Sequence, residues 1–317
     1  MAEIGLSMYD NDGGASIEAR LTARLEALGH RVVGKIDMRE SATRDGRVFT
    51  QDGRDLSALD VFFYMDADRQ SPNQADQLHA LERSGVRVVN TPGAYDAARD
   101  KPTANQMLRN AGISVPRSVL LTPRALARDA AALIRDWGSL VVKPRTRHGG
   151  YGIVRFTDAG QLADFCQIET GVDNYYCEEF IPFGDLDMRV EIAAGTGIGG
   201  YSRRRTHAFK TNVSSGGIMT PNPPDTALRG LAEDAARAIG LEYSIVDFLR
   251  DERNGRVTVV EVNPILGIFV EEAMRVSPKT SLREVDPSYA LDARKLEILT
   301  DHLDRLSRAP VAERRIA

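Results

Sequence analysis

The sequence predicts an α/β (α+β) protein that opens with a doubly wound βαβ domain. Over the first 90 residues, short apolar runs alternate with stretches whose apolar residues recur at helical spacing. The alternation continues to about residue 181, whereas the chain from Met188 onward is rich in predicted strands and contains one helix among them. We therefore expect three parts, at residues 1–90, 91–181 and 182–317.

The composition is that of an ordinary soluble globular protein. The chain has 317 residues, of which 42% are hydrophobic and 27% charged, so it can bury a substantial core. A net charge of -4 argues against nucleic-acid binding, which normally relies on a strongly basic face. No apolar run reaches membrane-spanning length, and the start of the chain lacks the features of a signal peptide. We expect a cytoplasmic protein with no nucleic-acid or membrane partner.

The first part is predicted to alternate strands and helices. The expected strands are residues 3–8, 31–33, 59–65 and 86–90, and the expected helices are residues 16–29 and 72–84. Residues 10–14 follow the first strand, at the edge where doubly wound folds bind ligands. Their glycine spacing differs from that of a dinucleotide-binding fingerprint, and a plain turn explains them equally well.

A Thr-Pro-Gly sequence at residues 91–93 marks the start of the second part. There we expect helices at residues 96–111, 124–137 and 159–167, and strands at residues 115–121, 139–144, 153–156 and 175–181. The third part should contain helices at residues 225–239 and 289–306, and a disordered end beyond Pro310. The two cysteines, Cys166 and Cys177, lack metal-ligand spacing, so we interpret both as buried thiols.

Two expected strands of the third part, residues 245–249 and 257–263, each carry a carboxylate among apolar residues. Asp247 and Glu261 would be costly to bury without compensation, and a divalent cation is the natural candidate. The two-residue period of a strand places Glu261 and Asn263 on one face, together with Val257 and Val259.

The turn between these strands decides whether the carboxylates meet. A three-residue loop at 253–255 would place Asp247 opposite Glu261, whereas a two-residue Asn-Gly loop would place Val262 there. We prefer the first register because it assembles two carboxylates and an amide oxygen, which are hard ligands suited to Mg²⁺. The alternative is a solvent-facing hairpin that binds no metal.

A basic, glycine-rich loop follows Lys143, which ends an apolar strand. The loop contains Gly149, Gly150 and Gly152, and such glycines let backbone N–H groups approach a phosphate closely. A lysine that enters a cleft beside this loop would add a point positive charge. A surface turn without a ligand is the alternative.

Several motifs occur in a consistent order along residues 85–272. They are Arg99-Asp100-Lys101, Val142-Lys143-Pro144, Glu178-Glu179-Phe180-Ile181, Asp187-Met188-Arg189, Tyr201-Ser202-Arg203-Arg204, Phe209-Lys210-Thr211-Asn212, and Asp247 with Glu261-Val262-Asn263. In this order they resemble the RimK-like branch of the ATP-grasp superfamily, whose members are carboxylate–amine (amino acid or peptide) ligases. The βαβ region resembles the domain that usually precedes an ATP-grasp fold.

The resemblance implies a role for each of these motifs. Lys101 and Lys143 would contact ATP, beneath a flexible loop that contains Gly149, Gly150 and Gly152. The hinge that recognises adenine would be Glu178, Glu179, Phe180 and Ile181, with Asp187 near the ribose. Arg189, Arg203 and Asn212 would act in catalysis. Asp247, Glu261 and Asn263 would bind Mg²⁺, or Mn²⁺ in its place.

The activity implied is ATP-dependent formation of an amide or peptide bond through an acyl phosphate. A carboxylate would attack the γ-phosphate of ATP, and an amine would then displace phosphate. Both partners would be small molecules, with glutamate or another amino acid as one of them, and the resemblance allows a homo-oligomer, a dimer or a tetramer. A phosphotransferase and a non-catalytic ATP-binding regulatory protein are the alternatives, although the latter would tend to lose its metal ligands.

Two segments depart from the family pattern. Ser214 and Ser215 stand before Gly216-Gly217, where family members often have Arg-Gly-Gly. After Glu261-Val262-Asn263, many members have a proline-glycine pair two residues further on, whereas this chain has Pro-Ile-Leu-Gly at residues 264–267. Both segments border the acceptor pocket in the family, so the identity of the acceptor remains open. The basic residues Arg203, Arg204, Arg205 and Lys210 would suit an anionic acceptor, or form a solvated charged run.

Overall fold

The computed structural model describes residues 1–8, 14–65, 72–147, 149–168, 171–267, 274–277, 280–281 and 290–309. The predicted loop at residues 10–14 lies outside these ranges except for Gly14, as does the end of the chain beyond residue 309. In the described part, every helix is too short or too polar to cross a membrane.

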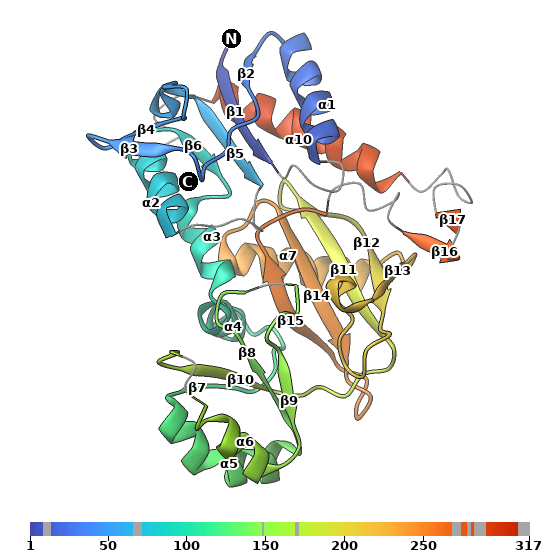
Figure 1. The fold of residues 1–317 in the computed structure, drawn as a ribbon. Coiled ribbons are helices and arrows are strands. Elements are labelled where there is room, and N and C mark those ends of the chain that lie inside the picture. Colours follow the sequence, from blue (N-terminus) through green and yellow to red (C-terminus); the bar gives the residue numbers. More distant parts are fainter. Residues whose placement is uncertain are drawn as a thin grey trace.

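The first sheet is parallel, as the βαβ rhythm predicts. Its strands lie in the order β2 (Arg31–Val33), β1 (Glu3–Met8), β5 (Val61–Met65), β6 (Arg87–Val89). One face packs against α1 (Gly14–Ala27) and α10 (Leu291–Arg308), and the other against α2 (Pro72–Arg83), so the domain is doubly wound (Figure 1). An additional hairpin, β3 (Ala42–Arg44) and β4 (Arg47–Phe49), leads to the short helix η1 (Leu56–Ala58), which the sequence pattern did not predict.

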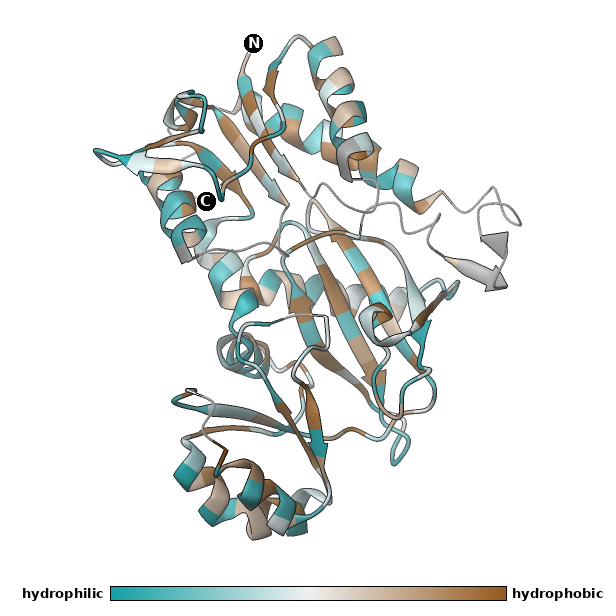
Figure 2. Ribbon diagram, in the orientation of Figure 1, coloured by the Kyte–Doolittle hydropathy of each residue, from teal (hydrophilic) through white to brown (hydrophobic). Residues whose placement is uncertain are grey.

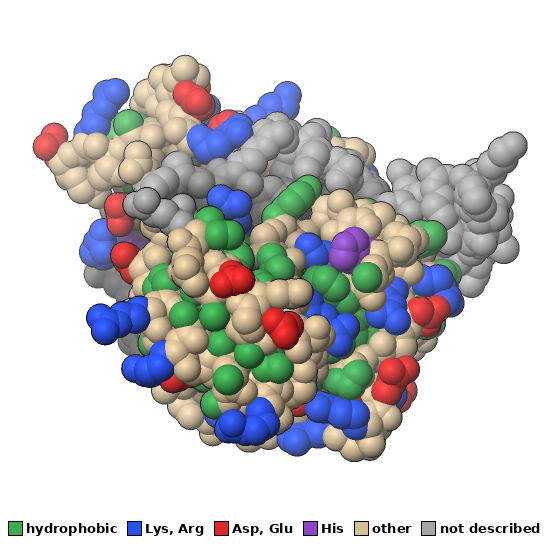
Figure 3. All heavy atoms as spheres, turned by 60° about the horizontal axis from the view of Figure 1, so that its bottom comes forward, with side chains coloured by type: hydrophobic (Ala, Val, Ile, Leu, Met, Phe, Trp, Pro, Cys, Tyr) green, Lys and Arg blue, Asp and Glu red, His purple; other side chains and the backbone are tan. Residues whose placement is uncertain are grey.

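The second sheet forms a small α/β unit at the lower end of Figure 1. Its antiparallel strands lie in the order β7 (Ser118–Leu121), β10 (Tyr175–Glu179), β8 (Leu140–Lys143), β9 (Val154–Phe156). Helices α5 (Pro123–Trp137) and α6 (Ala159–Phe165) cover one face, and Cys166 and Cys177 are buried there as expected. Seen from below, hydrophobic side chains gather near the centre of the visible face, with many lysines and arginines around them (Figure 3).

The third sheet has five antiparallel strands. Their order is β13 (Ile218–Thr220), β12 (Thr196–Arg204), β11 (Leu186–Ala193), β14 (Ser244–Arg250), β15 (Val257–Asn263). One face packs against α7 (Thr226–Ile239), α3 (Pro92–Arg99) and α4 (Lys101–Asn110). The hydrophobic residues of these strands appear as the brown segments of Figure 2. A two-stranded piece, β16 (Arg275–Ser277) and β17 (Thr280–Ser281), completes the described strands.

The single helix predicted at residues 96–111 is wrong, because the structure has two helices that meet at Asp100. Asp100 is extended, with φ -89° and ψ 96°, and α4 begins at the next residue. Pro102 explains the break, since proline has no N–H to continue a helix but is tolerated in a first turn. Lys101 therefore begins a new helix, α4, and does not continue α3.

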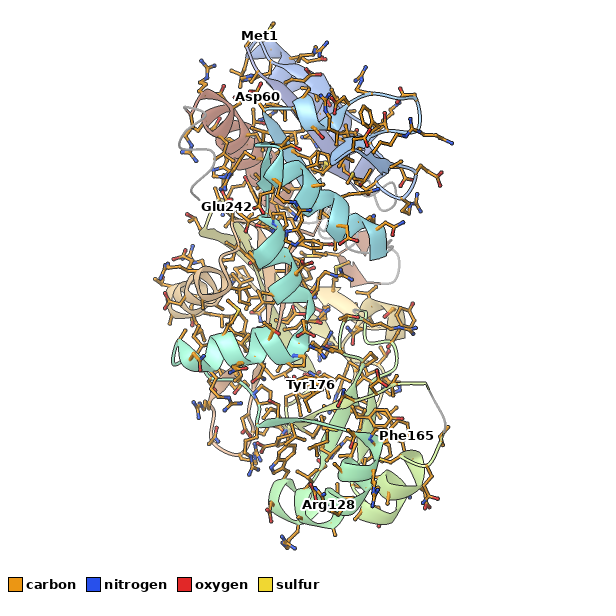
Figure 4. All side chains as sticks on the ribbon, turned by 90° about the vertical axis from the view of Figure 1, so that its left-hand side faces the viewer. Met1, Asp60, Arg128, Phe165, Tyr176 and Glu242 are labelled. Carbon is orange, nitrogen blue, oxygen red and sulfur yellow. The ribbon has the colours of Figure 1, made fainter. Side chains whose placement is uncertain are left out.

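The predicted divisions at residues 90 and 181 separate the three sheets along the chain, but packing crosses them. Helix α10, at the end of the described chain, packs on the first sheet and also contacts β11 and β12. Near this junction Arg87 donates to Glu242 at 2.7 Å, and His302 of α10 lies 2.7 Å from the same carboxylate, which Figure 4 labels. The Asn90 side chain also bonds the backbone of Tyr243. The first and third sheets are thus tied together by polar contacts.

The β14–β15 hairpin pairs Asp247 with Glu261, as the preferred register predicts. The predicted three-residue loop is wrong, however, because six residues, 251–256, separate the strands and Arg250 pairs with Val257. Within this connection the Asp251 N–H donates to the carbonyl of Arg256 at 2.9 Å. A bulge at Val260 restores the expected pairing by inserting one extra residue into β15. Inserting a residue flips the alternation, so Val259 and Val262 both enter the core while Glu261 faces the opposite side.

Candidate active site

A cleft of about 870 Å³, open to solvent, lies between the second and third sheets. Twelve of the predicted site residues line it: Lys101, Lys143, Gly150, Glu178, Glu179, Phe180, Ile181, Asp187, Arg203, Asn212, Asp247 and Glu261. Four others, Gly149, Gly152, Arg189 and Asn263, lie outside the lining. Residues from two sheets and from α4 thus converge on one cleft, although they are spread over 160 positions of the sequence, from 101 to 261.

Two lysines enter the cleft and each contacts a carboxylate. Lys143, at the end of β8, forms an ion pair with Glu178 of the neighbouring strand β10. Lys101, at the start of α4, places its Nζ 3.2 Å from Oε1 of Glu261. Burial alone would raise the pKa of Glu261, but the positive charges of Lys101 and Lys143 outweigh it and lower that pKa to about 2. Glu261 is therefore ionised at neutral pH.

The free energy of unfolding should depend on Glu261 in the acid range. Because the pKa of Glu261 in the folded chain lies below its ordinary value of 4.5, its stabilising contribution is complete above about pH 4.5 and is lost as the pH falls toward 2. Urea unfolding at pH 6 and pH 3.5 should show a greater loss of stability for the wild type than for Glu261→Gln, by roughly 1 kcal/mol. An equal loss in both proteins would contradict a carboxylate held in its ionised form.

Two arginines hold the second carboxylate of the hairpin. Arg189 of β11 donates to Asp247 from Nε at 2.6 Å and from Nη2 at 2.7 Å. Arg203 of β12 donates to the same carboxylate from Nη2 at 3.1 Å. Such two-pronged contacts fix the position and orientation of a carboxylate. The predicted catalytic arginines therefore lie beside the predicted metal ligand Asp247.

Asp187 of β11 is the register partner of Arg203 on the neighbouring strand β12. Its carboxylate accepts hydrogen bonds from the Arg203 backbone N–H at 2.9 Å, from Arg203 Nε at 2.9 Å and from the Thr211 hydroxyl at 2.6 Å. Only 2% of Asp187 is exposed. The structure thus places Asp187 where it orients Arg203, and its predicted position near a ribose stays a prediction.

The hairpin residues offer oxygen atoms suited to a hard cation. Asp247 and Glu261 are register partners on adjacent strands, and Asn263 follows Glu261 by two positions. No group of three or more His, Cys, Asp and Glu in the described ranges is arranged to hold a metal. Two carboxylates and one amide nevertheless fit Mg²⁺, which keeps several waters and usually takes one or two protein carboxylates. A carboxylate oxygen that accepts one N–H retains a lone pair for a cation.

The predicted hinge comprises the last two residues of β10, Glu178 and Glu179, and the two residues that follow, Phe180 and Ile181. The Glu179 side chain accepts hydrogen bonds from Arg117 and Arg253, both at 2.7 Å. The backbone N–H of Phe180 donates to Ser139 at 3.0 Å. Among the hydrogen bonds of the described residues, none uses the N–H of Ile181. The N–H of Ile181 is therefore left to contact a ligand in the cleft, which Glu178, Phe180 and Ile181 all line.

The glycine-rich loop crosses from the second sheet toward the third. Gly149, Gly150 and Gly152 have φ values of +70°, +72° and +73°, which residues other than glycine rarely adopt. A Cβ on Gly150 would lie 2.3 Å from Oδ1 of Asn212, so the two segments touch without spare room. The carbonyl of Gly150 also accepts a hydrogen bond from Lys210 at 3.1 Å. His148, which the sequence placed in this loop, lies outside the described residues.

Several residues that line the cleft were not predicted. They are mainly apolar: Pro116, Val141, Ile153, Phe183, Leu249 and Val260, together with the polar Thr211. Most resemble ordinary core or loop residues in the sequence. The two-residue period of a strand would have indicated Leu249, since it lies two positions after Asp247 on the same face.

Comparison with known proteins gives a consistent result. Residues 98–276 match the RimK-like ATP-grasp domain. The tetrahydromethanopterin:alpha-L-glutamate ligase of Methanosarcina acetivorans is 29% identical over 189 residues, which cover 55% of this chain and 57% of that protein. A probable alpha-L-glutamate ligase of Thioalkalivibrio sulfidiphilus is 30% identical over 60% of this chain and 64% of its own length. The chain therefore matches less than two thirds of each of these two relatives.

Solved structures with low sequence identity share the fold. A RimK domain ATP-grasp protein from Sphaerobacter thermophilus aligns with a TM-score of 0.65 and 19% identity, over 97% of this chain and 100% of that chain. The ATP-grasp ligase PsnB, in a complex with minimal precursor, Mg and ADP, aligns with a TM-score of 0.64 and 18% identity, over 96% of this chain and 97% of that chain. The similarity extends over almost the whole described chain, including the first sheet.

Proposed function

This chain belongs to the RimK-like ATP-grasp family, and we propose that it is an ATP-dependent carboxylate–amine ligase. The observation that carries the proposal is the position of Glu261, an ionised carboxylate held beside Lys101 in the same cleft as Asp247. Phosphoryl transfer from ATP requires cations to neutralise the phosphates and carboxylates to hold Mg²⁺. The cleft contains both.

ATP would bind with its base toward the hinge and its phosphates beneath the glycine-rich loop. Apolar side chains on both sheets, including Val141 and Leu249, can enclose the flat faces of adenine. The N–H of Ile181, together with Glu178, would contact the polar edge of the base. Lys143 and Lys101 would then lie near the phosphates, and each would exchange its present carboxylate partner for phosphate oxygens.

Asp247, Glu261 and Asn263 would hold Mg²⁺, for which Mn²⁺ could substitute because both cations prefer oxygen ligands. The cation supplies charge neutralisation at the phosphates when it is bound. Arg189 and Arg203 hold Asp247 in place, since each donates to its carboxylate. Replacing either arginine would leave a buried carboxylate with fewer partners.

Bond formation would proceed in two steps without a protein nucleophile. An oxygen of the substrate carboxylate attacks the γ-phosphorus, ADP leaves, and an acyl phosphate forms. The amine then attacks the acyl carbon, phosphate leaves, and the amine loses a proton. Arg203 and Asn212 line the cleft and can donate hydrogen bonds to the developing negative charge. The glycine-rich loop would exclude water from the acyl phosphate.

Glutamate is the first substrate to test, because both curated relatives described above are named as glutamate ligases. A peptide substrate is the second, since PsnB was solved with a precursor peptide. The departures at Ser214 and Ser215 make it necessary to test both classes. Arg147 and Lys210, which line the cleft, favour an acidic substrate of either class.

A ligase needs two substrates besides ATP. We expect ADP release to require both an acid and an amine, and hydroxylamine to give a hydroxamate when the amine is omitted. ADP release should be screened with glutamate, other amino acids and short acidic peptides, each with and without a second amine. A single acceptor that supports full turnover and yields a stable phosphorylated product would indicate a phosphotransferase.

A further inference from the structure

Residues 210–214 follow the β12 strand and reach the glycine-rich loop. Lys210 donates from Nζ to the carbonyl of Gly150 at 3.1 Å. Ser214 donates from its hydroxyl to the carbonyl of the preceding glycine, Gly149. Two consecutive carbonyls of the loop are thus bound from the other side of the cleft. These contacts hold the loop across the opening.

Thr211, in the same segment, lines the cleft and contacts Asp187 of β11. It is 8% exposed, and its hydroxyl donates to Oδ2 of Asp187 at 2.6 Å. The same carboxylate accepts from the backbone and the guanidinium of Arg203. The Thr211 hydroxyl therefore helps to fix the carboxylate that orients Arg203.

The orientation of Arg203 matters because its guanidinium lies between two carboxylates. Nη2 of Arg203 is 3.1 Å from Oδ2 of Asp247, while the Nε side of the group is bonded to Asp187. A planar guanidinium makes such contacts only in a narrow range of orientations. A shift of Asp187 would therefore change how Arg203 meets Asp247 and any phosphate nearby.

The segment has little room in which these contacts could move independently. Asn212 packs against Gly150, where a Cβ would lie 2.3 Å from Oδ1, and residues 213–215 form one turn of 3-10 helix, η2 (Val213–Ser215). Thr211 lies between Lys210 and Asn212, both of which contact the glycine-rich loop. A displacement of the loop would therefore also shift the Thr211 hydroxyl.

We propose that residues 210–214 couple closure of the glycine-rich loop to the placement of Arg203, with Thr211 as the positioning residue. This inference rests on the proposed function, because ATP binding beneath the loop is assigned there. In the closed state, Lys210 and Ser214 hold the loop while Thr211 holds Asp187 against Arg203. Opening of the loop to release nucleotide would loosen Arg203 at the same time.

The coupling can be tested by the release of a fluorescent ADP analogue, N-methylanthraniloyl-ADP, in the presence of Mg²⁺. Thr211→Val keeps the shape of the side chain but removes the hydroxyl donor. We expect nucleotide release about five- to tenfold faster and ADP formation reduced by a similar factor, which corresponds to the loss of one buried hydrogen bond. Thr211→Ser should restore both rates. Thr220→Val, which removes a hydroxyl on exposed β13, is the matched control and should change neither.

Ser214→Ala should accelerate release and reduce turnover in the same way, with Ser84→Ala, directly after helix α2, as its control. If the two contacts are coupled, the double variant should show less than the product of the two single effects. Independent, multiplying effects would overturn the proposal, as would a Thr211→Val variant with reduced turnover but unchanged release. If the wild type fails to bind the ADP analogue, the proposed function itself is wrong, so the two failures are distinguishable.

Discussion

Glu261→Gln is expected to lower ADP formation by roughly 10²-fold or more at saturating ATP, because a key electrostatic group is lost from the phosphoryl-transfer site. Glutamine has nearly the same shape, so the fold should be kept. The substitution removes the ionised carboxylate that contacts Lys101 and that is proposed to bind Mg²⁺. Measuring turnover over a range of Mg²⁺ concentrations separates weaker metal binding from an impaired chemical step.

Glu252→Gln is the matched control for this substitution. Glu252 lies in the exposed loop of the same hairpin, only nine positions away, so the variant makes the same chemical change outside the cleft. Its turnover should equal that of the wild type. Near-native turnover of Glu261→Gln at limiting Mg²⁺ would show that Glu261 does not serve as a metal ligand.

Gly150→Ala should reduce turnover by roughly 10²-fold, since small misplacements of groups that close over a reaction have effects of this size. The added methyl would lie 2.3 Å from Oδ1 of Asn212, and the φ of +72° disfavours any side chain. The loop would be forced away from residues 210–214. Water could then reach an activated intermediate, so the variant should also hydrolyse a larger share of the ATP that it consumes.

Gly171→Ala separates the steric effect from the backbone effect. Gly171 has a similar φ of +68°, but a Cβ there would meet no atom within 4 Å. The Gly171→Ala variant should lose about as much stability as Gly150→Ala but keep the turnover of the wild type. If both variants lost turnover equally, the contact between Gly150 and Asn212 would not be needed for closure.

The fold was largely predictable because periodic patterns report on local structure. The strand at Glu3–Met8 was predicted to the residue, and the βαβ rhythm of the first part correctly indicated a parallel sheet. The helix break at Asp100 was missed, although Pro102 marks it in the sequence. The bulge at Val260 could not be predicted, because no residue type distinguishes an inserted position in a run of valines.

The structure gathers many of the candidate residues in one cleft, but their contacts were not predictable from the sequence. The order of the motifs predicted that Asp247 and Glu261 lie in one site, and both line the cleft in the structure. The partners of these carboxylates depend on how the sheets pack, which a motif does not encode. Thr211 is the clearest example, because a threonine in a loop gives no sign that it contacts an aspartate 24 positions away.

The central claim, that a substrate carboxylate is activated by phosphorylation, is tested most directly by the transfer of oxygen. The acid identified by the ADP screen would be labelled with ¹⁸O in its carboxylate, and the phosphate released with the amine present would be analysed by ³¹P NMR. An acyl phosphate requires one labelled oxygen to pass from the acid to each phosphate, while the other stays in the amide. Released phosphate without ¹⁸O would contradict the proposed ligase mechanism.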